Sequence, residues 1–291
     1  MILPRLEDRV IFLFDVDGVI AETPHEEAWK AAAVEWGIIP EDFSFTLFYA
    51  KHVAGEPGIT GARNILGLLR EGAKPTYYER EGITDTHKRD ESAEQFRNPA
   101  KQKYLDGYIA DGNFRVFDDI SKIILGAKNA GIPVAAVSSS ENSEAILKSI
   151  NAIELAKRVK VPYTPARKDA SLYDVFNTTV LGAITHWHGA KVEKINHYAM
   201  AYGKLLGKID RKEIPYAVVF EDAPKGVAAV SQLGFYCIGI SRNSTSGVTL
   251  ASKEDLFRTG AKLAYAENEL KHIGYKQLRP AIIGIIPMEV K

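Results

Sequence analysis

This 291-residue chain has a single cysteine, no formal net charge and no long apolar stretch. The single cysteine, Cys237, excludes an intrachain disulfide framework and also excludes a structural zinc site built from clustered cysteines. Lysine plus arginine and aspartate plus glutamate both total 37, so the formal net charge is zero. The chain therefore lacks the basic footprint of a nucleic-acid or membrane-surface binder, and we expect neither partner.

No run of 18 apolar residues occurs, so the sequence predicts no membrane-spanning helix. Acidic residues precede the first short apolar stretch, which is not the pattern of a signal peptide, and we expect a cytoplasmic protein. Hydrophobic residues make up 46% and charged residues 25%, the balance of an ordinary globular protein. The length allows a core domain that carries a second, smaller one, as a monomer or a homodimer.

Short β-branched apolar runs that end at turn residues predict buried strands. The four clear runs and one weaker run are Val10–Phe14, Val134–Val137, Ala217–Phe220, Phe235–Ile240 and Lys262–Tyr265. Helical patterns lie between them, at Ser121–Ala130, Ser143–Ile150, Tyr198–Leu206 and Gly226–Leu233. Strands that alternate with helices predict an α/β fold with a Rossmann-like parallel sheet covered on both faces.

More than a hundred residues separate the first two strands, too many for a single helical connection. Helical patterns fill this gap, at Glu26–Trp36, Ala62–Leu69 and Ala93–Ala110, whereas Thr76–Asp90 is dense in charge and fits a solvated helix pair or a loop. We therefore expect an inserted α-helical domain over residues 19–112 and a core domain over 1–18 and 113–291. The connection Val161–Gly189 has no clear assignment, and Ala281–Ile286 fits a strand or a packing arm.

Polar side chains follow three of the predicted strands. Because open α/β sheets bind ligands at the carboxyl ends of their strands, these groups are expected to converge. They are Asp15 and Asp17 after the first strand, Ser138, Ser139 and Ser140 after the second, and Glu221 and Asp222 after the third. Lys191 or Lys194 lies just before the helix that leads into the third strand.

Four carboxylates in one crevice, those of Asp15, Asp17, Glu221 and Asp222, would repel one another unless a cation neutralised them. Hard oxygen ligands suit Mg²⁺, which is the cofactor we expect these residues to bind. One carboxylate could attack phosphorus while its neighbour protonates the leaving oxygen. A serine hydroxyl and the lysine would hold the phosphoryl oxygens.

Each motif alone also fits a turn or a helix cap. Their joint placement after three strands favours a site, and here the sequence resembles the haloacid-dehalogenase superfamily of phosphatases and mutases. Phe14–Val19 resembles the first motif of that family, which implies Asp15 as nucleophile and Asp17 as general acid and base. Val137–Ser140 resembles the second motif and implies Ser138, with Ser139 beside it, as phosphate ligand. Val219–Val227 resembles the motif that contributes metal-binding acids.

Lys194 matches the family's lysine motif better than Lys191, although the prolines that usually surround this lysine are missing. Several local patterns resemble the β-phosphoglucomutase-like group, which carries a helical cap after the first motif. They are His25 with Trp29, Val53–Pro57 followed by Gly61, Ala62 and Arg63, Arg97 and Asn98 ahead of Lys101, and Asn142 after the serines. The resemblance implies substrate contacts from His25, Arg63 and Asn142. A plain role for His25, as a polar residue on the first cap helix, fits equally well.

Gly58 and Glu141 stand where that group usually has basic residues. A mutase must hold two phosphates at once, whereas a phosphatase holds one, so the missing charges favour a phosphatase. The expected function is Mg²⁺-dependent hydrolysis of a small phosphorylated metabolite such as a sugar phosphate. The alternatives are a β-phosphoglucomutase-like phosphomutase and a non-catalytic phosphate-binding or regulatory protein.

Overall fold

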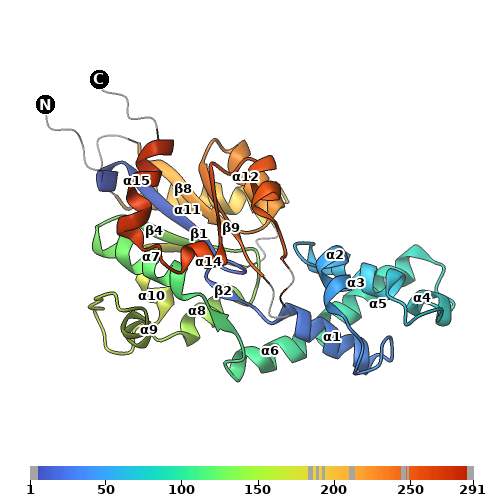
Figure 1. Ribbon diagram of the computed structural model, residues 1–291. Helices are drawn as coiled ribbons and strands as arrows, with labels where there is room; N and C mark the ends of the chain where they lie inside the picture. Colours follow the sequence, from blue (N-terminus) through green and yellow to red (C-terminus); the bar gives the residue numbers. More distant parts are fainter. Residues whose placement is uncertain are drawn as a thin grey trace, which may run out of the picture. The chain divides into compact units, whose positions relative to one another are not determined.

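The computed structural model describes residues 6–286, apart from 183–185, 188–189, 192–193, 210–213, 244–246 and 248. The chain forms two compact units (Figure 1). The first, which we call the sheet unit, comprises Met1–Glu22, Arg115–Arg242 and Ala251–Lys291. The second, the helical unit, comprises Thr23–Phe114 and Asn243–Leu250, a short segment that the sequence prediction had placed in the core domain.

The sheet unit contains a six-stranded sheet in the order β10-β9-β8-β1-β4-β5, and every neighbouring pair is parallel. The strands are β1 (Val10–Asp15), β4 (Val134–Val137), β5 (Thr178–Val180), β8 (Tyr216–Glu221), β9 (Tyr236–Ser241) and β10 (Leu263–Ala266). This arrangement confirms the predicted α/β class with a Rossmann-like parallel sheet. Two short antiparallel pairs join β2 (Ala21–Glu22) to β3 (Arg115–Val116) and β6 (His186–Trp187) to β7 (Ala190–Lys191).

Helices cover both faces of the sheet (Figure 1). They are α7 (Asp118–Asn129), α8 (Ser143–Ser149), α9 (Ala152–Val159), α10 (Leu172–Val175), α11 (Lys194–Leu206), α12 (Pro224–Gln232), α13 (Lys253–Arg258), α14 (Glu267–Leu270) and α15 (Tyr275–Ile285), with the short turn η1 (Leu6–Asp8) before β1. Among the described residues, no helix is both long and apolar enough to cross a membrane.

The central strand β1 is buried along its whole length, so its side chains divide between two cores. Ile11 and Leu13 join the core cluster to which α11 and α12 also contribute. Phe12 and Phe14 contact Phe220 of β8, with the Phe14 and Phe220 rings stacked at 4.4 Å. Burial on both faces explains why the strand reads as one apolar run rather than as an alternating pattern.

The helical unit contains α1 (His25–Glu35), α2 (Thr46–His52), α3 (Gly58–Leu68), α4 (Tyr77–Arg80), α5 (Thr86–Gln95), the π-helical turn η2 (Phe96–Lys101) and α6 (Gln102–Ala110). Its own core includes Trp29, Phe45, Ile65, Leu66 and Phe96. The charged segment Thr76–Asp90 holds α4 and the start of α5, as a solvated helix pair requires.

The structure assigns two segments that the sequence left open. The unassigned connection Val161–Gly189 contains α10 and β5, the sixth strand of the sheet. Residues Ala281–Ile286 are not a strand, because α15 runs through Ile285. Leu278 and Ile282 are buried four residues apart, the spacing of one face of a helix, so the apolar run belongs to a helix packed by one side.

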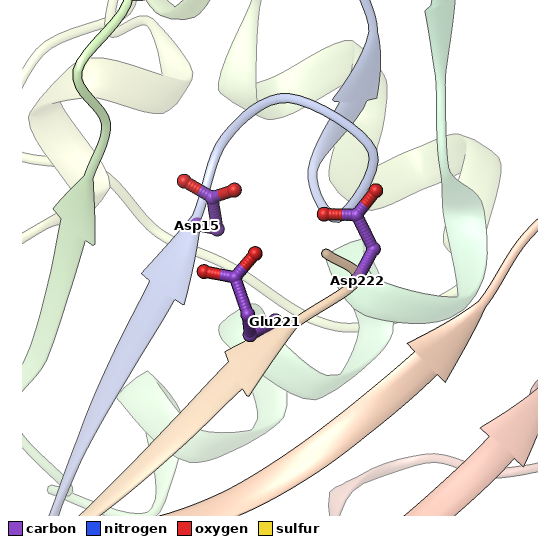
Figure 2. A group of neighbouring side chains, drawn as sticks. All are labelled: Asp15, Glu221 and Asp222. Atoms are coloured by element: carbon purple, nitrogen blue, oxygen red, sulfur yellow. The ribbon is translucent and has the colours of Figure 1, made fainter. Parts of the chain in front are cut away.

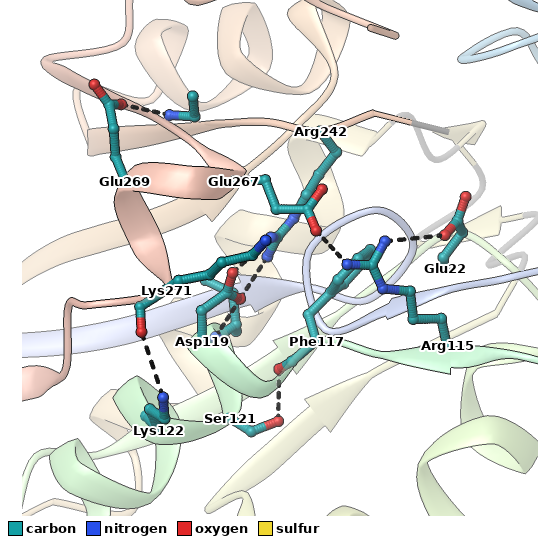
Figure 3. A network of polar contacts seen from close by, with 12 residues as sticks. Glu22, Arg115, Phe117, Asp119, Ser121, Lys122, Arg242, Glu267, Glu269 and Lys271 are labelled. Atoms are coloured by element: carbon teal, nitrogen blue, oxygen red, sulfur yellow. Dashed lines mark hydrogen bonds and ion pairs between the residues drawn. The ribbon is translucent and has the colours of Figure 1, made fainter. Parts of the chain in front are cut away.

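A polar network within the sheet unit includes residues at which the chain leaves or re-enters that unit (Figure 3). Arg115 pairs with Glu22 and Glu267. Arg242 makes two hydrogen bonds of 2.7 Å to the Asp119 carboxylate and lies 3.9 Å over the Phe117 ring. Glu22, Arg115 and Arg242 are terminal residues of sheet-unit segments at three of the four crossings, so the network holds these three segment ends within the sheet unit.

We predict that Asp119→Asn will destabilise the protein by about 3 kcal/mol, because it leaves the buried guanidinium of Arg242 without its counter-charge. Asp118→Asn is the matched control at the neighbouring position. The Asp118 pair with Arg158 is about half exposed, so its loss should cost less than about 1 kcal/mol. Denaturant unfolding of both variants measures the difference, and equal stabilities would contradict the role assigned to the buried pair.

Candidate active site

The register of the sheet brings three strand ends to one edge. Asp15, the last residue of β1, pairs with Val137, the last residue of β4, and Phe14 pairs with Phe220 of β8. Glu221 ends β8 one residue later. The groups that follow β1, β4 and β8 therefore lie side by side, although more than a hundred residues separate the first strand from the next.

Three carboxylates form the centre of this edge (Figure 2). One oxygen from each of Asp15, Glu221 and Asp222 lies within 4.8 Å of the others. Asp15 is only 3% exposed and Glu221 is fully buried, so water screens their repulsion poorly. A set of hard oxygen donors at this spacing fits a divalent cation such as Mg²⁺.

Two glycines, Gly18 and Gly226, make room for the carboxylates because they have no side chain. A Cβ at Gly18 would lie 1.9 Å from an oxygen of Asp222, and Gly18 also has a positive φ of 78°. A Cβ at Gly226 would lie 2.2 Å from an oxygen of Glu221. Any larger residue at either position would displace a carboxylate, which gives both glycines of the sequence motifs a physical reason.

Asp17 lies outside the group of three carboxylates and contacts hydroxyl groups instead. Its Oδ2 accepts hydrogen bonds from Ser138 at 3.2 Å and from Ser143 at 3.4 Å. The single hydroxyl hydrogen of Ser143 is shared with Ser138 Oγ, which lies 2.8 Å from Ser143 Oγ. These contacts bring the second strand end to the first, as the sequence predicted, and they add Ser143, which the sequence analysis did not select.

Glu221 has two donors of its own. The backbone N–H of Ala223 donates to Oε1 at 3.1 Å, and the Tyr198 hydroxyl donates to Oε2. Tyr198 lies on α11 and is fully buried. Burial, together with the negative charges of Glu221 and Asp15, raises the pKa of Tyr198 well above its ordinary value, so the phenol keeps its proton.

Four further residues of the sheet unit were predicted to belong to the site, and the structure describes the side chains of only two of them. Ser139 is exposed and Asn142 is half-buried beside the start of α8. Lys191 ends β7 and Lys194 begins α11, but both side chains lie outside the described part of the structure. The choice between the two lysines therefore stays a prediction.

Two residues of the helical unit, His25 and Arg63, were predicted to contact substrate, and their surroundings differ. His25, at the start of α1, has its Nδ1 3.0 Å from the ammonium group of Lys101, which is buried and lies 5.4 Å over the Trp29 ring. Arg63 instead pairs with Asp90 at 2.8 Å, and both side chains are about half exposed. The charge of Arg63 is thus balanced within the helical unit.

Sequence signals for the missed residues are weak. Ser143 is the first residue of α8, directly after the N-cap residue Asn142, and short polar residues are common at helix starts. Tyr198 fits an ordinary packing position of α11. Their hydroxyl groups contact the site only because α8 and α11 pack beside the strand ends, a relation that no local pattern contains.

No protein-family model matches the sequence, and no curated protein is similar to it at a significant level. Solved structures do match. An archaeal β-phosphoglucomutase from Pyrococcus sp. strain ST 04 shares 25% identity, with a TM-score of 0.68 and coverage of 94% of this chain and 99% of that chain.

Two more distant structures share the fold. CbbY from Rhodobacter sphaeroides, solved with xylulose-1,5-bisphosphate, has 18% identity and a TM-score of 0.55, with coverage of 91% and 96%. A haloacid-dehalogenase-like hydrolase from Streptococcus pneumoniae has 13% identity and a TM-score of 0.53, with coverage of 92% and 97%. The sheet order, the motif residues at its strand ends and these likenesses place the chain in the haloacid-dehalogenase superfamily, within its β-phosphoglucomutase-like group.

Proposed function

We propose that the protein is a Mg²⁺-dependent phosphatase that hydrolyses a small phosphorylated metabolite, such as a sugar phosphate, through an aspartyl-phosphate intermediate. The observation that carries the proposal is the meeting of Asp15, Glu221 and Asp222 beside the hydrogen-bonded pair of Asp17 and Ser138. Phosphatases and phosphomutases among the similar structures support phosphoryl transfer as the reaction class. The finer assignment rests on the chemistry of these side chains.

In the first step, an oxygen of Asp15 attacks the phosphorus atom, and the bond from phosphorus to the ester oxygen breaks. Asp17 donates its proton to the departing oxygen. In the second step, Asp17 takes a proton from water as that water attacks the phosphoryl group, which releases inorganic phosphate and regenerates the Asp15 carboxylate. Mg²⁺, held by Asp15, Glu221 and Asp222, would neutralise the negative charge of the phosphoryl oxygens when bound.

The contacts of Asp17 support its role as acid and base. Two hydroxyl groups, those of Ser138 and Ser143, hold its Oδ2, and its carboxylate lies outside the three that meet within reach of one cation. We therefore assign the carboxylate of Asp17 to proton transfer rather than to the cation. Ser138 would turn its hydroxyl to the phosphoryl group together with Ser139 and with Lys194 or Lys191.

Substrate selection is proposed for His25 and Asn142. The charges of the helical unit favour a single phosphate. Arg63 is balanced by Asp90, and Arg97, whose side chain lies against Gly58, pairs with Glu94 at 3.0 Å. A bisphosphate needs cations that are not already neutralised.

A phosphomutase is the second candidate. The similarity to an archaeal β-phosphoglucomutase favours it, as does the buried Lys101 beside His25, which keeps a cation near a polar group of the helical unit. Both candidates share the aspartyl phosphate and differ in the fate of the phosphoryl group. Water receives it in a phosphatase, whereas a second hydroxyl of the sugar receives it in a mutase.

A panel of sugar monophosphates with Mg²⁺, followed by phosphorus NMR, distinguishes the two candidates. We expect inorganic phosphate as the product, and removal of divalent cations with EDTA should abolish its release until Mg²⁺ is restored. An isomerised sugar phosphate as the main product would make the protein a mutase. Absence of both products from a folded, metal-binding protein would favour the non-catalytic phosphate-binding or regulatory alternative.

Asp15→Asn should abolish turnover while the fold is kept, because the amide cannot attack phosphorus but fills the same space. Acid-quenched samples of the wild-type protein should contain covalent phosphate, and samples of the variant should contain none. Phosphate release by Asp15→Asn at a near-normal rate would remove the nucleophile assignment.

Asp17→Asn should slow both the formation and the hydrolysis of the phosphoenzyme by about 10²–10⁴-fold, because the amide neither donates nor accepts the required proton. Rapid-quench kinetics separate the two steps. Ser143→Ala is a milder companion, since it removes one hydrogen bond to Asp17 and leaves the carboxylate in place. A wild-type rate in both steps of Asp17→Asn would exclude its role in proton transfer.

A further inference from the structure

We propose that Tyr198 is a positioning residue, which holds the carboxylate of Glu221 in the orientation that binds the divalent cation. The proposal rests on the proposed function, because it concerns the cation site of that reaction. Nothing in the sequence motifs points to Tyr198, which belongs to the connection between β7 and β8.

The alternation of side chains along β8 directs Glu221 toward α11. Ala217 and Val219 lie in the core cluster that also contains Tyr198, Ala201 and Leu205 of that helix. Glu221 continues the same face of the strand, two residues after Val219. The fully buried carboxylate therefore meets the helix surface rather than water.

Both oxygens of Glu221 have a donor. Tyr198 donates its hydroxyl hydrogen to Oε2, and the Ala223 N–H occupies Oε1 from the other side. Gly226 lies directly against the Glu221 carboxyl group, because a side chain at this position would overlap that group. Because the two bonds hold different oxygens of one planar group, the carboxylate cannot rotate without losing one of these donors.

This orientation matters because Asp15 and Asp222 form the rest of the site. Tyr198 adds no charge, so it orients Glu221 without competing with a cation for the three carboxylates. A lysine or arginine in its place would neutralise the group that the cation needs. Partners of this kind, bonded to a metal ligand and not to the metal, typically contribute 10–100-fold to metal affinity.

A purely structural role for Tyr198 is the competing explanation, since its ring belongs to the core. Tyr198→Phe separates the two roles, because it keeps the ring and removes the hydroxyl. Tyr202→Phe is the matched control. Tyr202 lies one turn further along α11, and its hydroxyl donates to the carbonyl of Pro215 at 2.8 Å instead of to a carboxylate.

The probe is Mn²⁺, whose binding is measured by electron paramagnetic resonance without turnover. We expect Tyr198→Phe to weaken Mn²⁺ binding about 10-fold and Tyr202→Phe to leave it unchanged. In activity assays, Tyr198→Phe should require a higher Mg²⁺ concentration for half-maximal rate and should regain much of its rate at saturating Mg²⁺. Thermal unfolding of each variant checks that the fold is kept.

Wild-type Mn²⁺ affinity in Tyr198→Phe would overturn the proposal while leaving the proposed function intact. A lowered melting temperature with unchanged affinity would likewise identify a structural role alone. Failure of the wild-type protein itself to bind Mn²⁺ would overturn the cation site, and with it both proposals.

A double-mutant cycle keeps the proposal testable if Tyr198→Phe is poorly stable. In a Glu221→Gln background, the change Tyr198→Phe should have no further effect on Mn²⁺ affinity, because the residue acts through that carboxylate. An equal loss in both backgrounds would contradict action through Glu221.

Discussion

Three carboxylates held together at one edge of a buried parallel sheet are the constraint on which the rest of the site depends. Asp15, Glu221 and Asp222 lie within reach of one cation, and two of them are almost fully buried. Their mutual repulsion makes the arrangement costly without a divalent ion and suited to one when it binds. Gly18 and Gly226 are required because the carboxylates fill the space where side chains would stand.

Neutral donors support this charged centre. Tyr198 and the Ala223 N–H hold Glu221, and Ser138 and Ser143 hold Asp17. Such donors fix the direction of a carboxylate and leave its charge available to a cation or a proton. The network at the crossings between the units follows the opposite rule, since its guanidinium and carboxylate groups neutralise each other within the chain. The carboxylates of the site therefore remain available to bind a ligand, whereas the charged groups at the crossings form ion pairs within the chain.

Most of the sheet could be predicted from the sequence because its strands are buried on both faces and form continuous apolar runs. The edge strand β5 could not, since its three residues, two threonines and one valine, favour a strand but are too few to form a recognisable apolar run. The sequence left the C-terminal run around Ile282 open between a strand and a packing arm, because an apolar segment of six residues fits a strand or one face of a helix equally well. Only packing against the sheet unit made it part of α15.

The sequence by itself predicted phosphoryl transfer, because paired acids, serine and a further acidic pair follow three successive strands and resemble the motifs of a known family. It could not determine how the four carboxylates divide their work. The tertiary structure groups Asp15 with Glu221 and Asp222 and turns Asp17 toward Ser138, a difference that depends on strand register and on side-chain direction. It also brings the Tyr198 hydroxyl to Glu221, because a hydroxyl on a helix joins the site only when that helix packs against the strand that carries Glu221.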